Sequence, residues 1–127
     1  FVSRNDSRAL QVKADPIHNS QTVPIIVIVS EDTVSYGEIF AGVLKDLGRA
    51  KVVGQTSNGN VEVLHGYNFD DNSQVWIASE TFYSATSETN FELSGIIPDV
   101  EAFAEWDTIT FETDPSIKAA LGLLGHQ

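Results

Sequence analysis

The stretch from Val23 to Gly48 holds the two most regular patterns in the chain and places the tightest limits on its fold. Val23 to Ser30 is an apolar, β-branched run without polar alternation, which is typical of a central strand covered on both faces. After a short polar turn, apolar residues recur at spacings of three and four, which predicts a helix that ends at Gly48. The residues of this apolar stripe are Tyr36, Ile39, Phe40, Val43, Leu44 and Leu47.

The segments that follow predict further strands and one more helix. Ala50 to Val53 is a short strand, and the order strand, helix, strand predicts a right-handed crossover in a parallel or mixed sheet. Val61 to Phe69 and Gln74 to Tyr83 predict the arms of a long hairpin, because turn residues separate them. Asp114-Pro115 places a capping residue before a proline and predicts a short terminal helix. The fold class is therefore α/β.

The organisation of the chain is that of one unit. No repeat and no change of composition divides the 127 residues, so we expect a single domain over 1–127. Weak signals suggest short strands at 1–4 and 9–12 around a polar turn. The sequence has no methionine and begins in what resembles the end of a strand. We therefore expect the C-terminal part of a larger protein.

Charge and composition exclude several classes of function. Seven Lys and Arg against 18 Asp and Glu give a net charge of -11, which argues against nucleic acid and anionic membrane surfaces as partners. The longest apolar run is too short to span a bilayer, so we expect no membrane insertion. There is no cysteine for a thiolate site. Asp70, Asp71 and Asn72 lack the glycine and distal glutamate of a calcium loop, so we expect no metal.

Ser35 stands at the junction between the predicted strand and the helix, and the local pattern leaves two interpretations open. Ser35 and Glu38 fit a capping box, in which the hydroxyl and the carboxylate each accept a backbone N–H. Alternatively, the turn exposes the hydroxyl as a nucleophile, where free N–H groups at the positive helix end stabilise an oxyanion.

Four motifs in register favour the second interpretation. They are Thr33-Val34-Ser35-Tyr36-Gly37-Glu38-Ile39, Gly48-Arg49-Ala50, Val52-Val53-Gly54 and Gly95-Ile96-Ile97-Pro98-Asp99-Val100. In these motifs the chain resembles the C-terminal processing, or tail-specific, serine peptidases. The resemblance implies a crotonase-like or Clp-protease-like core of β-β-α units, with Ser35 as nucleophile and the Tyr36 N–H as an oxyanion donor. It also implies a peptide or protein substrate, no cofactor, and an exported bacterial protein in the periplasm or outside the cell.

One departure from that family concerns the general base. The tail-specific members have a lysine 25 residues after the serine, where this chain has Asn60. A neutral amide cannot take the proton of a serine hydroxyl, so we expect Asn60 only to form hydrogen bonds near the pocket. The chain also resembles the tricorn-like members, which lack the lysine. That likeness implies a histidine from upstream as the base, oriented by Glu92, with Glu62 as a minor alternative.

Two classes of function therefore stay open. The first is a serine peptidase that is inactive as an isolated piece because its base is missing. The second is a non-catalytic module that binds peptides or assembles with partners. The histidines of the chain, His18, His65 and His126, are placed in a loop, in the hairpin and at the terminus, where a solvated side chain is the simpler interpretation. An exposed strand edge also predicts a possible homodimer.

Overall fold

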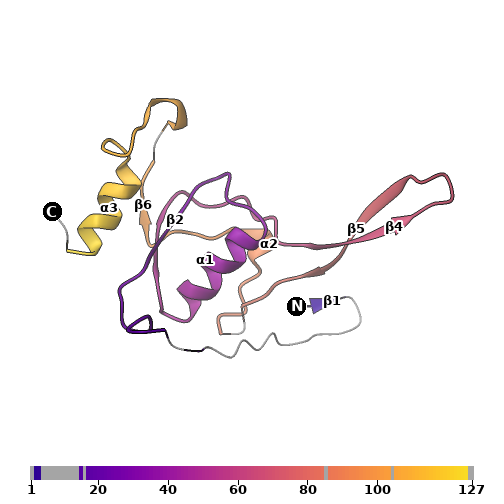
Figure 1. The fold of residues 1–127 in the computed structure, drawn as a ribbon, viewed down its shortest axis with the longest axis horizontal. Coiled ribbons are helices and arrows are strands. Elements are labelled where there is room, and N and C mark those ends of the chain that lie inside the picture. Colours follow the sequence, from indigo (N-terminus) through magenta and orange to yellow (C-terminus); the bar gives the residue numbers. More distant parts are fainter. Residues whose placement is uncertain (1, 4–14, 16, 85, 104, 126–127) are drawn as a thin grey trace.

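The computed structural model describes residues 2–3, 15, 17–84, 86–103 and 105–125 and shows two small sheets with three α-helices (Figure 1). The first sheet has the order β2-β3-β6, and the second has the order β1-β5-β4. The strands are β1 (Val2–Ser3), β2 (Ile26–Val29), β3 (Lys51–Gly54), β4 (Val63–Asn68), β5 (Gln74–Thr81) and β6 (Val100–Glu101). The helices are α1 (Tyr36–Asp46), α2 (Phe91–Ser94), the 3-10 turn η1 (Trp106–Thr108) and α3 (Pro115–Leu123).

The predicted parallel pairing of two strands joined by a helix is confirmed. β2 and β3 pair in parallel, with Ile26 opposite Lys51 and Val29 opposite Gly54, and α1 connects them. β6 adds to the other side of β3, also in parallel. Both α1 and α3 contact β2 and β3, and Figure 1 shows the two helices on either side of this sheet. The arrangement is the mixed α/β class that the sequence predicts.

The expectation that the Val23 to Ser30 run forms a central strand is wrong. β2 lies at an edge of its sheet, and Ile28 is 45% exposed. β3 is the central strand, and its Val52 and Val53 are fully buried. An unbroken apolar run shows that a strand is largely apolar, but it does not show on which side a neighbouring strand will pair.

The buried face of α1 also differs from the predicted apolar stripe. Tyr36 and Phe40 are more than 60% exposed, while α1 buries Glu38, Ala41 and Gly42. The reason is close packing, because a Cβ built on Gly42 would lie 2.7 Å from Cζ of Phe91. Small residues let the helix approach its neighbours here, and this contact outweighs the pattern of large apolar side chains.

The predicted β4–β5 hairpin and the capped α3 helix are confirmed. The hairpin pairs Asn68 with Gln74, and Figure 1 shows it extending away from α1 and the other sheet. Asp114 Oδ1 accepts the Ser116 N–H at 2.7 Å at the start of α3. Of the weak N-terminal signals, β1 pairs with β5, whereas 9–12 lies outside the described residues. No helix in the described part is long and apolar enough to cross a membrane.

Asp99 fixes the end of the Gly-Ile-Ile-Pro-Asp-Val motif to the sheet. Its carboxylate accepts the Val52 N–H at 2.8 Å and lies 3.6 Å from Lys45 Nζ and 3.7 Å from Lys51 Nζ. Partial burial acts to raise the pKa of Asp99, but the Val52 hydrogen bond and the two lysine charges outweigh it and hold the pKa below 3.8. The ionised carboxylate therefore stabilises this corner of the fold.

Replacing Asp99 by asparagine should lower stability by about 1 kcal/mol at pH 7, since the ion pairs are lost while the amide oxygen still accepts from Val52. A lowered folded-state pKa adds stability above the unfolded value, and this stability is lost as pH falls through the folded value. The difference in stability between Asp99→Asn and wild type should therefore close as the pH falls through the folded-state pKa of Asp99, which lies below 3.8. Hydrogen-exchange protection of the Val52 amide at pH 7 and at an acid pH below that pKa measures the difference. A difference of equal size at both pH values would contradict this account.

Candidate active site

Ser35 has a strained backbone at the turn that leads into α1. Its φ of 57° and ψ of -127° lie where residues with a Cβ are seldom found. Such a conformation costs about 1–3 kcal/mol and persists only where surrounding contacts impose it. Here the Ser35 N–H is held between the Asn60 carbonyl oxygen at 2.7 Å and Glu38 Oε2 at 3.1 Å.

The capping interpretation of Ser35 explains only part of this geometry. Both halves of a capping box are present, because the Glu38 carboxylate accepts the Ser35 N–H and the Ser35 side chain faces the Glu38 N–H. The second contact does not reach the geometry of a standard hydrogen bond. The Glu38 N–H donates to the Ser35 carbonyl oxygen at 3.0 Å instead. The hydroxyl is therefore not consumed by capping the helix.

Glu38 holds the turn and the facing loop together. Its fully buried carboxylate accepts from Ser57 Oγ and the Gly59 N–H, both at 2.6 Å, on one oxygen. The other oxygen accepts from the Asn60 N–H at 2.8 Å and from Ser35. A buried charge is tolerated because each oxygen has two donors. The sequence predicted only the contact with Ser35, so most of this network is new.

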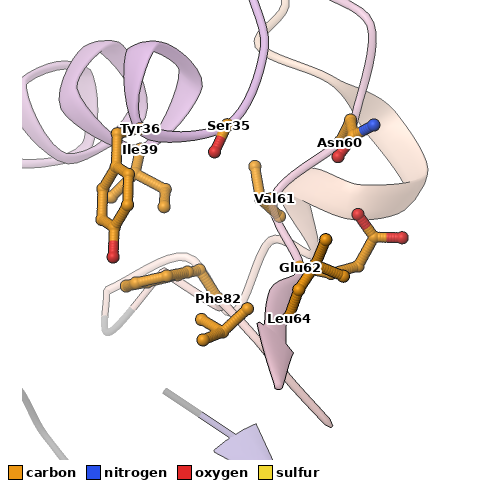
Figure 2. Close-up of a pocket in the computed structure, with 9 residues that line it drawn as sticks. Ser35, Tyr36, Ile39, Asn60, Val61, Glu62, Leu64 and Phe82 are labelled. Carbon is orange, nitrogen blue, oxygen red and sulfur yellow. The ribbon is translucent and has the colours of Figure 1, made fainter. Parts of the chain in front are cut away.

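A cavity of about 500 Å³ opens beside Ser35. Four residues predicted for the site line it, namely Ser35, Tyr36, Asn60 and Glu62. The remaining lining residues are apolar and were not predicted: Ile39, Val61, Val63, Leu64 and Phe82. Figure 2 shows these side chains around the space that the Ser35 hydroxyl faces. Asn60 and Glu62 precede β4, because that strand begins at Val63.

The Tyr36 N–H is suited to stabilise negative charge in this cavity. It is the first N–H of α1, and within the described residues it has no hydrogen-bond acceptor. The N-terminus of a helix carries a partial positive charge, which adds to the effect of the N–H itself. A peptide carbonyl oxygen attacked by Ser35 would develop its charge next to this group.

Glu92 lies behind the cavity wall and does not line the cavity. Its Oε2 accepts the Val61 N–H at 2.8 Å, and Asn90 caps the short α2 helix that carries it. Partial burial is the main cause that raises the pKa of Glu92, and the nearby Glu62 carboxyl raises it further, against the opposing Val61 hydrogen bond. Two carboxyl groups thus meet at one side of the site.

The cavity lining contains no histidine and no lysine among the described residues. His65 lies on β4 and contacts the Tyr67 ring at a centroid distance of 4.8 Å, and His18 lies in an exposed turn. His126 lies outside the described residues. The ion pairs with Asp99 occupy Lys45 and Lys51. No group of three or more metal-binding side chains occurs in the part of the chain that the structure describes.

This fold, with a strained serine between a parallel strand and a helix, is that of a known class of hydrolases. The model of peptidase family S41 matches residues 2–102 of the chain. The chain therefore belongs to peptidase family S41, which confirms the resemblance inferred from the four motifs.

Curated relatives carry names of the same kind. A probable CtpA-like serine protease of Staphylococcus aureus (strain COL) is 26% identical over 137 residues, covering 96% of this chain and 27% of the relative. The chloroplastic carboxyl-terminal-processing peptidase 3 of Arabidopsis thaliana is 29% identical over 102 residues, covering 80% of this chain and 20% of the relative. The chain thus spans about a quarter of the length of the curated relatives it matches.

Solved structures share the fold. The tricorn protease aligns with a TM-score of 0.62 at 27% identity, covering 80% of this chain and 10% of that one. The photosystem II D1 C-terminal processing protease aligns with a TM-score of 0.56 at 22% identity, covering 75% of this chain and 24% of that one. The α/β fold class predicted from the sequence agrees with both.

Proposed function

We propose that this chain supplies the nucleophile and part of the oxyanion hole of a serine peptidase. Ser35 attacks a peptide carbonyl, the amine leaves, and water then hydrolyses the acyl-enzyme. The observation that carries this proposal is the strained Ser35, whose hydroxyl faces a cavity of about 500 Å³. Beside it lies the Tyr36 N–H, which has no acceptor among the described residues. Membership of family S41 and the names of the relatives support it.

The general base in this proposal is a histidine from a part of the protein outside these 127 residues. The cavity lining contains no histidine and no lysine among the described residues, and Asn60 stands where the tail-specific family has lysine. Glu92 and Glu62 give the adjacent carboxyl groups that orient an imidazole and stabilise its charged form. Asn60 forms hydrogen bonds at the pocket. The second oxyanion N–H also comes from outside the chain.

We extend the proposal to the whole protein. The chain is the C-terminal part of a catalytic domain, acts on peptides or protein tails as an exported protein, and is inactive when isolated. The side of β2 away from β3 has no neighbouring strand in the part of the chain that the structure describes, and a second copy can pair along this edge. Light scattering on the isolated chain at millimolar concentration should therefore give the mass of a dimer, and a monomer would contradict that pairing.

A burst of product followed by slow turnover would reveal the acyl-enzyme. In the protein that contains this chain, rapid mixing with a peptide thioester should release about one thiol per active site before the steady state, with the acyl group on Ser35 by mass spectrometry. Glu92→Gln should lower kcat about 10²–10⁴-fold with KM little changed, because it loses the charge that stabilises the imidazolium. An acyl group on any other residue would contradict the proposal.

The competing function is a peptide-binding module without catalysis. Asn60 in place of a lysine base is the observation that favours it. A pseudoenzyme would bind peptides in the cavity without forming any acyl adduct. A saturable peptide affinity that is unchanged in Ser35→Ala, together with no burst in wild type, would support this second function.

A further inference from the structure

The side chain of Tyr36 forms one wall of the cavity, separately from the backbone N–H. Its ring meets the Phe82 ring edge to face, with centroids 6.4 Å apart and an interplanar angle of 70°. Phe82 is 7% exposed, so its ring is held by the surrounding core, whereas Tyr36 is 69% exposed. Figure 2 shows the Tyr36 ring extending from the start of α1 towards Phe82 along one side of the cavity.

The rest of this side of the cavity is apolar. Ile39 lies one turn along α1, and Val61 is 1% exposed in the opposite wall. Among the described residues, Glu62 is the one charged side chain in the lining, and Figure 2 shows its carboxylate on the far side from the aromatic pair. The Glu62 carboxyl lies beside that of Glu92. A side chain entering between Tyr36 and Val61 would therefore meet carbon atoms and ring faces.

We propose that the Tyr36 and Phe82 rings form an aromatic wall that selects an aromatic or large aliphatic side chain at the residue whose carbonyl Ser35 attacks. This inference rests on the proposed peptidase function. Edge-to-face ring contacts add to the favourable burial of an aromatic group, and each methylene that fills an apolar pocket adds further binding. A small residue such as alanine gains neither contribution.

Tyr36 lies beside the nucleophile although most of its side chain is exposed, so its contacts within the described residues stabilise it only weakly. The Tyr36 hydroxyl has no hydrogen-bond partner within the described residues, and most of the ring faces solvent. A bound side chain packed against the ring would bury that surface. Phe40 lies one turn further along α1, is 61% exposed, and does not line the cavity. It therefore provides a matched control on the same helix.

The test uses the protein that contains this chain and a library of internally quenched peptides, with the cut sites located by mass spectrometry. Wild type should cut after Phe, Tyr or Leu in preference to Ala. For a matched pair of peptides, Tyr36→Ala should lower the Phe-to-Ala ratio of kcat/KM about tenfold. Tyr36→Phe should keep the ratio, because it retains the ring, and Phe40→Ala should leave it unchanged.

The outcomes separate this inference from the function on which it rests. An unchanged ratio in Tyr36→Ala, with both peptides still cut, would overturn the aromatic wall and leave the peptidase function standing. A preference of wild type for Lys or Arg, directed by Glu62, would also overturn it. Absence of any cut by wild type, together with absence of an acyl-enzyme, would contradict the proposed function and this inference together.

Discussion

Replacing Ser35 by alanine should lower kcat for peptide hydrolysis at least about 10³-fold, to the level given by binding and the oxyanion hole alone. Only the hydroxyl group is removed, and it makes no cap hydrogen bond of standard geometry. The free energy of unfolding should therefore change little. Ser30→Ala is the matched control, because Ser30 lies in the same turn and outside the cavity lining. Retention of more than a tenth of wild-type kcat by Ser35→Ala would contradict the assignment.

Replacing Ser35 by glycine separates the hydroxyl from the strain. Glycine adopts positive φ without steric cost, so the variant should be equally inactive but more stable than Ser35→Ala by about 1 kcal/mol. Unfolding in urea of the two variants in the protein that contains this chain measures the difference. Equal stability would mean that the Ser35 backbone carries no strain.

Replacing Glu38 by glutamine should lower stability by about 2–4 kcal/mol. Both carboxylate oxygens accept two hydrogen bonds each, and the amide of glutamine turns a donor towards one of these pairs. Two buried N–H groups, or the Ser57 hydroxyl and Gly59 N–H, would then lose their acceptor. The strained turn at Ser35 would loosen, so kcat should also fall about 10²-fold.

Glu31→Gln provides the control for Glu38. Glu31 is exposed in the turn before the same helix, and its replacement should change stability by no more than about 0.5 kcal/mol. Urea unfolding and peptide hydrolysis of both variants give the comparison. A Glu38→Gln protein as stable as Glu31→Gln would show that the buried carboxylate does not hold the site together.

Local patterns were sufficient for the elements of the fold and insufficient for their packing. The spacing of apolar residues placed α1, and turn residues placed the β4–β5 hairpin, because both signals are contained within each segment. The buried face of α1 depends instead on Gly42 meeting Phe91, which lies far along the chain. Likewise, β2 became an edge strand because β6 pairs on the other side of β3.

In the candidate site, too, some features could be predicted from the sequence and others depend on contacts between distant parts of the chain. Ser35, Tyr36 and Asn60, which the resemblance assigns to the site, line one cavity in the structure. The network of Glu38 could not be predicted from the capping pattern, since Ser57 and Gly59 reach the carboxylate only after the loop folds back. The contact between Tyr36 and Phe82 could not be predicted either, because Phe82 follows the end of β5, far along the chain from Tyr36.

Labelling with a fluorophosphonate tests the central claim most directly, because this reagent reacts with activated serine hydroxyls. The protein that contains this chain should be labelled on Ser35, as located by mass spectrometry, while Ser35→Ala is not labelled. Ser30→Ala should be labelled as wild type is, and Glu92→Gln more slowly. A folded wild-type protein that takes up no label, or takes it up on another serine, would contradict the account.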